Sequence, residues 1–278
     1  MNKILIALDM GPLSYNQLVY ALRWAETLQS QLHVIHVYQI PVVSADSFVY
    51  VPDASSLEEI RKTKMDNLQT LIHQVIHDTK INQPTTLDCV FGQPSEVIES
   101  IAKENHCDLI ILGLHNQSYL AERLLGSTTT FLFRHGSIPV LAIHQESHLV
   151  ELKNILFAYD RKPFSNKYIL QPLVKISEAF DARIHIVTIE TEIEDFPLIS
   201  ESLIDEKLDA MPDLNRVSYH VVQKENVVDG LKEYCAQHDI DLIVLVPRKH
   251  HFFERLVTES SSKKIAYHLD IPVLALHD

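Results

Sequence analysis

Apolar residues in this chain form two kinds of run that follow one another. Short, almost unbroken runs such as Ile4 to Leu8 and Leu109 to Leu112 are typical of parallel strands that are buried on both faces. The longer stretch from Ser14 to Leu28 carries apolar residues at helical spacing, with polar residues between them. The alternation predicts an α/β fold in which helices cover both faces of a parallel sheet.

The first half of the chain is predicted to contain five strands and the helices that connect them. The strands are expected at residues 4–8, 32–37, 86–91, 109–112 and 140–144. Helices are expected at residues 14–28, 57–79 and 94–105, and within 120–134. Ser95 is a candidate N-cap. The segment from Ile40 to Ser56 contains Pro41 and Pro52 and is predicted to be a loop.

The chain then repeats itself. The run from Ile4 to Asp9 returns as Ile155 to Asp160, and the run from Ile138 to His144 returns as Ile271 to His277. Because the matching segments keep their order, the chain is predicted to be a tandem duplication.

The duplication predicts one domain at residues 1–145 and a second at residues 152–278. A short polar linker that begins at Glu146 joins them. The second domain is the shorter one, and the missing residues match the region from Ile40 to Thr79 of the first. A length of 278 residues suits two domains of ordinary size.

Composition and charge argue against several classes of function. The net charge is -13, with 24 basic and 37 acidic residues, which argues against broad electrostatic binding of nucleic acid. No apolar run approaches the roughly 20 residues of a membrane span, and the start of the chain shows no secretory signal pattern. The three cysteines lie far apart and include no Cys-x-x-Cys pair, so no disulfide framework is indicated. We therefore expect a cytoplasmic protein that binds neither nucleic acid nor membranes.

The segment between the fourth and fifth strands carries residues that suit phosphate oxygens. Gly113 directly follows a strand, and a Gly-Ser-Thr run at Gly126 opens a predicted helix with unpaired amides and hydroxyls. Asp9 ends the first strand. Ligands of open parallel sheets bind at the carboxyl ends of the strands, near the point where the strand order reverses. We therefore expect Asp9 and Gly113 to face the same crevice.

This segment resembles the nucleotide-binding motif of the universal stress protein family. In that motif a glycine is followed after two residues by a second glycine, and after nine more by a glycine and a serine or threonine. Gly113, Asn116, Gly126 and Ser127 hold these positions, with asparagine in place of the second glycine. Asparagine suits the position if the motif needs a positive φ there, and it weakens binding if a side chain strikes the phosphates.

The resemblance covers essentially the whole chain as a tandem of two such domains. It implies two doubly wound, parallel five-stranded sheets of Rossmann-like type, with ATP or a related adenine nucleotide, and with Mg as a further candidate, in the first domain. An aspartate near the adenine is matched by Asp9, and a valine that ends the second strand is matched by Val37. The implied binding residues are Ala7, Asp9, Val37, Leu112, Gly113, Asn116, Gly126, Ser127 and Thr128.

The second domain has lost the motif. Val246, Lys249 and Glu259 stand where the first domain has Gly113, Asn116 and Gly126. A glutamate would repel a phosphate there, so we expect no nucleotide in this half.

The last strands of both copies are apolar edge strands, which need a partner. In the family these strands pair across a dimer interface, and in a tandem chain the two copies can pair with each other. We expect this internal pseudo-dimer, against the alternative that local helices cover each edge. A further homodimer of chains remains an open alternative.

Several histidines could bind a metal or have a structural role. His73 and His77 are four residues apart on a predicted helix, as metal ligands can be, but a solvated helix face is the favoured interpretation. His33, His36 and His185 lie in predicted strands, and we expect them to be hydrogen-bonded in or near the core.

The sequence thus favours a stress-response regulatory protein that binds ATP in its first domain. Catalysis is not implied, since no paired acid and base stands out, although slow hydrolysis of bound ATP stays open. The alternative is a nucleotide-free scaffold that acts through contacts with unknown protein partners. An adenylate-forming enzyme is a weaker third hypothesis, because neither a His-x-x-His nor a Ser-Gly-Gly-x-Asp motif is present.

Overall fold

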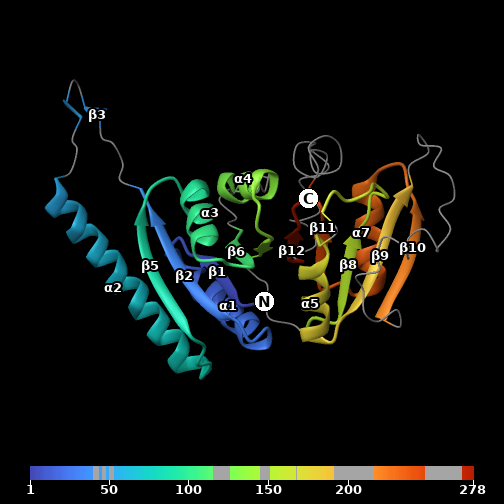
Figure 1. Cartoon of the computed structure of the whole chain (residues 1–278), viewed down its shortest axis with the longest axis horizontal. Coiled ribbons are helices and arrows are strands. Elements are labelled where there is room, and N and C mark those ends of the chain that lie inside the picture. Colours follow the sequence, from blue (N-terminus) through green and yellow to red (C-terminus); the bar gives the residue numbers. More distant parts are fainter. Residues whose placement is uncertain are drawn as a thin grey trace.

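The computed structural model describes most of the chain. The described residues are 1–39, 44–45, 48–49, 53–114, 126–144, 151–166, 168–190, 216–247 and 271–278. Within them the chain forms two similar α/β halves (Figure 1).

The first half shows the predicted alternation, with element ends within a few residues of those expected wherever the residues are described. Its strands in the main sheet are β1 (Lys3–Ala7), β2 (Gln31–Tyr38), β5 (Thr85–Phe91), β6 (Leu109–Gly113) and β7 (Val140–Ile143). Its helices are α1 (Ser14–Thr27), α2 (Ala54–Thr79), α3 (Pro94–Glu104) and α4 (Ser127–His135).

The prediction that residues 40–56 form only a loop is wrong. Within it β3 (Ser44–Ala45) pairs antiparallel with β4 (Phe48–Val49). Helix α2 also begins earlier than expected, because the carboxylate of Asp53 accepts a hydrogen bond from the amide of Ser56 at 2.8 Å and caps the first turn.

The prediction that Ser95 caps α3 is also wrong. Gln93 holds the N-cap position and Pro94 begins the helix. A proline suits that place because the amide it lacks would have no partner within the helix. Ser95 instead lies buried in the first turn.

The second half repeats the plan. Its strands are β8 (Asn154–Ala158), β9 (Arg183–Glu190), β10 (Val217–Gln223), β11 (Leu242–Leu245) and β12 (Val273–Ala275). Its described helices are α5 (Gln171–Phe180) and α7 (Val227–His238). The region predicted to be shortened falls mainly on 191–215, outside the described residues.

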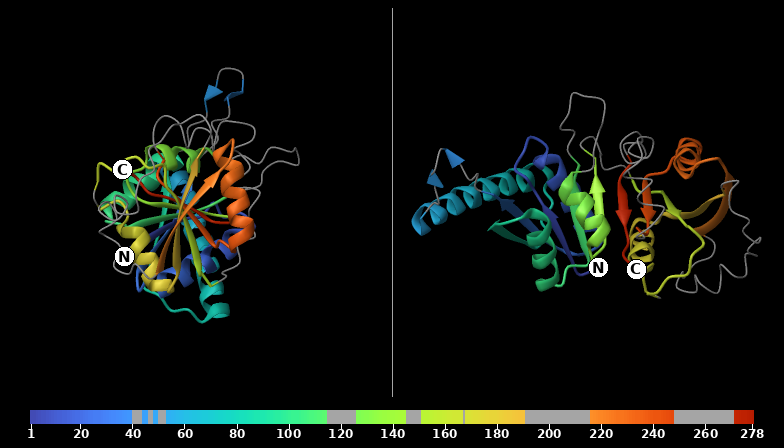
Figure 2. Two further views of the ribbon diagram at one scale, coloured as in Figure 1. Left: turned by 90° about the vertical axis from the view of Figure 1, so that its right-hand side faces the viewer. Right: turned by 90° about the horizontal axis from the view of Figure 1, so that it is seen from above.

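The strands of both halves form a single sheet with the order β10-β9-β8-β11-β12-β7-β6-β1-β2-β5. Neighbouring strands within each half are parallel. β12 and β7 are antiparallel, with Leu274 opposite Leu141. The predicted pairing of the last strands is therefore confirmed, and the two predicted five-stranded sheets join into one. Figure 2 shows the twist that accumulates across it.

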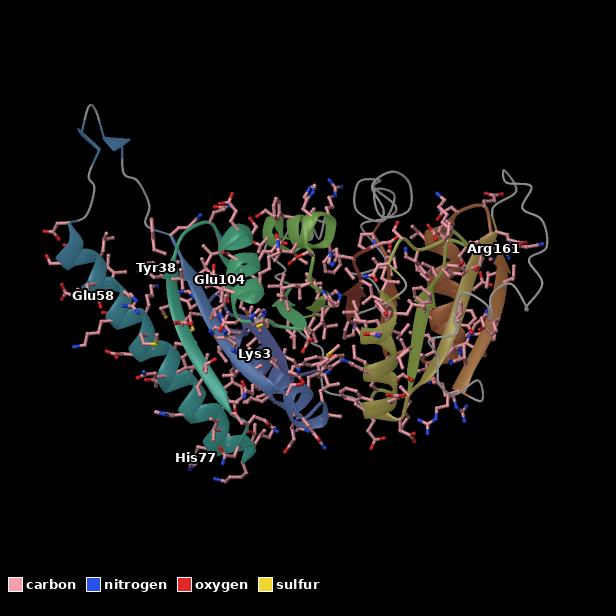
Figure 3. All side chains as sticks on the ribbon, viewed as in Figure 1. Lys3, Tyr38, Glu58, His77, Glu104 and Arg161 are labelled. Atoms are coloured by element: carbon pink, nitrogen blue, oxygen red, sulfur yellow. The ribbon has the colours of Figure 1, made fainter. Side chains whose placement is uncertain are left out.

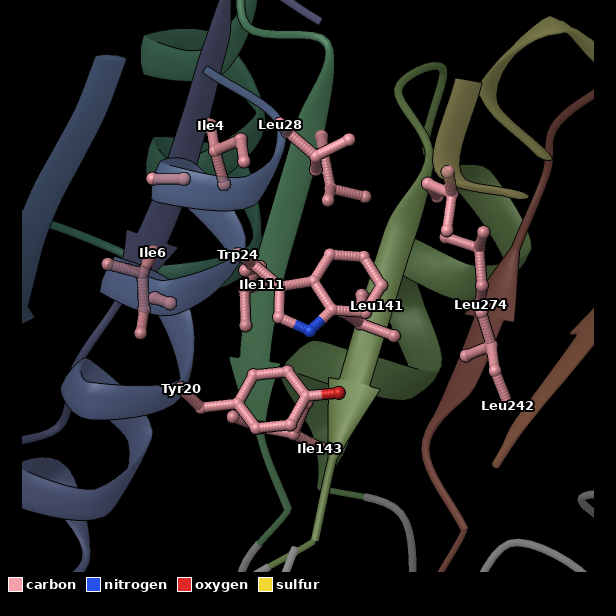
Figure 4. Packing of buried hydrophobic residues seen from close by; sticks show 14 of the residues in the cluster. Ile4, Ile6, Tyr20, Trp24, Leu28, Ile111, Leu141, Ile143, Leu242 and Leu274 are labelled. Carbon is pink, nitrogen blue, oxygen red and sulfur yellow. The ribbon is translucent and has the colours of Figure 1, made fainter. Parts of the chain in front are cut away.

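The hydrophobic core is continuous through the junction of the halves. One layer of buried side chains packs between the sheet and α1, α2 and α5, and a second layer packs between the sheet and α3, α4 and α7. Figure 4 shows Trp24 and Tyr20 of α1 beside the strands that carry Leu141 and Leu274. The ring of Trp24 also lies 5.0 Å from that of Phe180 in α5.

A hydrogen bond ties the end of the chain to the first half. The Nε2 atom of His277 lies 3.0 Å from the carbonyl oxygen of Leu132 in α4.

Among the described helices, none is long and apolar enough to cross a membrane.

Candidate functional site

The residues singled out in the sequence lie where the strand order of the first half reverses. β1 sits between β2 on one side and β6 on the other. Ala7 at the end of β1 pairs with Leu112 of β6, and Gly113 is the next residue of that strand. The structure therefore brings Ala7, Leu112 and Gly113 together at the carboxyl edge of the sheet, where ligands of such folds bind.

Asp9 lies just beyond the end of β1 and holds the turn into α1. Its Oδ1 atom accepts hydrogen bonds from the amide of Gly11 at 2.9 Å and from the hydroxyl of Ser14 at 3.1 Å. Met10 between them has a φ of 62°, so the chain reverses direction sharply. The exposed carboxylate of Asp9 is thus held in place at the carboxyl edge of the sheet.

Val37 lies near the end of the neighbouring strand β2 and is half-buried. Beside it in the chain, His36 is buried, and its Nδ1 atom lies 2.8 Å from the carbonyl oxygen of Leu8. Burial lowers the pKa of His36, so its ring is neutral at pH 7 and Nδ1 carries the donated proton. Val37 and Asp9 therefore end adjacent strands whose ends are fastened together.

Gly113 makes room for a polar side chain that the sequence analysis missed. Gln17 of α1 is only 3% exposed, and its amide lies over Gly113. A Cβ atom on Gly113 would come within 1.8 Å of the Gln17 Nε2 atom. Nε2 has no hydrogen-bond partner among the described residues. Gln17 lies on the buried face of α1, four residues before Ala21, where Ser14 is the other polar residue, and a polar residue on such a face was the available signal.

The glycine-serine-threonine run begins α4. Gly126 is the N-cap, Ser127 is exposed and Thr128 is half-buried. A Cβ atom on Gly126 would meet nothing within 4 Å, so no protein contact forces glycine there. The first amides of α4 carry the positive end of the helix dipole. Asn116 lies outside the described residues.

The matching crevice of the second half has different contents. Helices α1 and α5 end at matching residues with positive φ, Gln29 and Asp181, so Gln17 corresponds to Ile169. Gly113 corresponds to Val246. Both Ile169 and Val246 are buried in the same apolar layer.

An ion pair lies at this edge of the second half, although the Nη1 atom of Arg161 is buried without a hydrogen-bond partner among the described residues. Arg161 matches Met10 and, with a φ of 58°, also has a positive φ. It lies at the edge where the strands end (Figure 3). Its Nη2 atom contacts a carboxylate oxygen of Glu190 at 2.8 Å. Lys249 and Glu259, the other altered motif positions, lie outside the described residues.

The remaining candidates have ordinary structural roles. His73 and His77 are exposed on α2, and no cluster of three or more potential metal ligands occurs among the described residues. His33, His36 and His185 are hydrogen-bonded as expected, to Asp88, the Leu8 carbonyl and Tyr234. The cysteines are buried, and burial raises the pKa of Cys107 to about 11 and that of Cys235 to about 12.

The family model described as the universal stress protein family matches residues 1–144 and again residues 151–277. The chain belongs to the universal stress protein family. It is a tandem member, as its repeated sequence predicted.

Curated relatives of this universal stress protein each match about half of the chain. Universal stress protein YxiE of Bacillus subtilis is 30% identical over 148 residues, which are 51% of this chain and 98% of the relative. Universal stress protein Sll1388 of Synechocystis sp. is 31% identical over 154 residues, with 51% and 97% covered.

A solved structure matches both halves together. The crystal structure of a universal stress protein from Archaeoglobus fulgidus covers 99% of this chain and 95% of its own, with a TM-score of 0.72 and 16% identity. This likeness shows the fold of the whole chain.

Proposed function

We propose that the first half of this universal stress protein binds an adenine nucleotide, ATP or a close relative, and that the protein acts as a ligand-responsive regulator rather than an enzyme. The binding residues would be the nine implied by the family motif. Mg²⁺ would enter bound to the phosphates of the nucleotide. The residues of the crevice hold and orient a ligand, which is what a regulator needs.

The observation that carries this proposal is the start of α4. The space beside Gly126 is open, and Ser127 and Thr128 follow with hydroxyls and helix amides. Together with Gly113 at the reversal point, these groups suit the oxygens of a phosphate chain. Asp9 follows β1, which pairs with β6, and Val37 lies near the end of β2, the next strand beyond β1; the base would lie at their ends.

The test is thermal unfolding with and without excess Mg-ATP. A ligand at 100 times its dissociation constant should stabilise the wild-type protein by about 2.7 kcal/mol. Ser127→Glu should abolish this shift, because it puts a negative charge where the phosphates bind. The variant should still fold, because an acidic side chain in the first turn interacts favourably with the helix dipole.

The matched control is Gln74→Glu, which makes the same change of charge on the exposed face of α2. It should leave the shift caused by Mg-ATP unchanged. If millimolar Mg-ATP does not raise the melting temperature of the wild-type protein, the nucleotide proposal is wrong.

A nucleotide-free scaffold is the second candidate, and the second half favours it. Ile169 and Val246 put buried apolar side chains where the first half has Gln17 and Gly113, and Arg161 and Glu190 pair at the same edge of the sheet. If neither half bound ATP, the protein would act only through contacts between its surface and partner proteins.

A further inference from the structure

The residues around Gln17 do not account for the burial of its side-chain amide. Its side chain is 3% exposed, and the Nε2 atom finds no hydrogen-bond partner among the described residues. Burying a donor without a partner lowers the stability of a folded protein, so such groups are rare and call for an explanation.

The second half shows that the fold does not require this amide. Ile169 stands at the matching position, in the turn just before α5, and Val246 stands at the matching position after β11; both are buried in the apolar layer. The same architecture is thus built with two apolar side chains, which carry no unmet polar atom. The first half keeps glutamine and glycine in their place.

Gln17 is also in the right place to meet a ligand. Its amide lies over Gly113, at the carboxyl end of β6 and beside the reversal of strand order. The N-terminus of α1, where Gln17 lies in the first turn, is fastened to Asp9 through Ser14. The amide without a partner therefore lies beside the carboxyl edge of the sheet where the proposed nucleotide would bind.

We propose that Gln17 donates its amide N–H to a phosphate oxygen of the bound nucleotide, and that it makes the site prefer phosphorylated ligands. This inference rests on the proposed function. The chemistry follows from the group that lacks a partner: Nε2 is a donor, and phosphate oxygens are strong acceptors. Gly113 is needed for the same contact, because any side chain at that position would displace the amide of Gln17.

The experiment measures affinity for Mg-ATP and for adenosine by isothermal titration calorimetry. Gln17→Met keeps the length of the side chain and removes the donor. It should weaken Mg-ATP binding by about 10-fold to 100-fold, as expected for a lost hydrogen bond to a charged group. Adenosine lacks the phosphate acceptor, so its affinity should not change. The control is Ile169→Met, at the matching place of the second half, which should leave both affinities unchanged.

Thermal melting of the ligand-free protein separates this role from simple packing. Because Gln17→Met removes an unmet buried donor, its melting temperature should equal or exceed that of the wild type. A purely structural glutamine would instead give a lower melting temperature and an unchanged affinity for Mg-ATP.

A second variant tests the same contact from the other side. Gly113→Ala keeps Gln17 but places a methyl group where its amide lies, and it should weaken Mg-ATP binding by at least 10-fold. If the wild type binds Mg-ATP and both variants bind it equally well, the role of Gln17 is overturned and the proposed function stands. If the wild type binds neither ligand, both fall.

Discussion

The carboxyl edges of the two halves have corresponding strands and different side chains. In the first half Gln17 and His36 are buried with side-chain nitrogens that have no partner among the described residues. In the second half Ile169 takes the place of Gln17, and Thr188 takes the place of His36 and donates to the carbonyl of Tyr159 at 3.1 Å. The second half shows that the fold forms without Gln17 and His36, so these two polar side chains of the first half are not required by the fold.

A second difference lies deeper in the same sheet. In the first half His33 of β2 faces Asp88 of β5, with Nε2 and Oδ2 2.8 Å apart. In the second half the matching residues are His185 of β9 and His220 of β10, whose rings stack 5.6 Å apart. A carboxylate can balance the charge of a protonated imidazole, whereas a second imidazole cannot. The two halves should therefore respond differently to acid.

The largest expected effect comes from breaking the core that the halves share. Trp24→Ala should lower the free energy of unfolding by about 3–5 kcal/mol, because Trp24 is buried and packs against Tyr20 and Phe180. Chemical denaturation followed by circular dichroism would measure it.

The control for that variant is Phe131→Ala, since Phe131 is 38% exposed and its loss should have a much smaller effect. Because the core is continuous, the weakened protein should still unfold in one transition. Two separate transitions would show that the halves are independent and that the contact between Trp24 and Phe180 contributes little.

An intermediate effect is expected from acid. Burial, followed by the positive charges of His220, His238 and Arg183, lowers the pKa of His185. Burial and then His238 lower the pKa of His220. Above about pH 6.5 the folded and unfolded chains both hold neutral rings, so stability does not depend on them. Below it the unfolded chain takes up protons that the folded chain resists, and stability falls with pH.

Swapping the facing residues tests this difference. His220→Asp copies Asp88, and at pH 5 it should raise the stability of the protein by about 1.5 kcal/mol, the lower end of the range for a hydrogen bond to a charged group. The reciprocal change, Asp88→His, should increase the sensitivity to acid. Melting temperatures at pH 7 and pH 5 would measure both, and identical pH profiles in all three proteins would refute the explanation.

The smallest effect concerns the two strand-end aspartates. Asp9→Ala removes hydrogen bonds from Gly11 and Ser14, and Asp160→Ala removes the matching bond from the amide of Lys162. Each should lower the free energy of unfolding by only about 1 kcal/mol, because both sites are partly open to water. Only Asp9→Ala should weaken Mg-ATP binding in calorimetry. An equal loss of affinity in both variants would mean that the halves share the ligand.

Much of the fold could be predicted from the sequence because parallel strands that are buried on both faces appear in it as short, unbroken apolar runs. Runs such as Ile4 to Leu8 and their repetition predicted the strands and the duplication, and the resemblance to the family implied the pairing of the apolar last strands. The ends of the helices were less predictable, since the cap at Asp53 and the place of Ser95 depend on local hydrogen bonds.

The candidate site was less accessible from the sequence. The spacing of glycines and hydroxyl residues is visible in the sequence, so Gly113, Gly126 and Ser127 could be singled out. A glutamine on a helix usually faces water, and only the absence of a side chain at Gly113 allows Gln17 to be buried. Likewise, nothing near His185 in the sequence shows that His220 lies beside it, because strand register decides that contact.

The backbone that joins the two halves, whose strands β7 and β12 pair, fixes the stoichiometry of the assembly. When two such domains are separate molecules, their association depends on concentration and is lost on dilution. Here the backbone connects them, so every molecule carries one half of each kind in a ratio of one to one. Changes in expression level cannot alter that ratio.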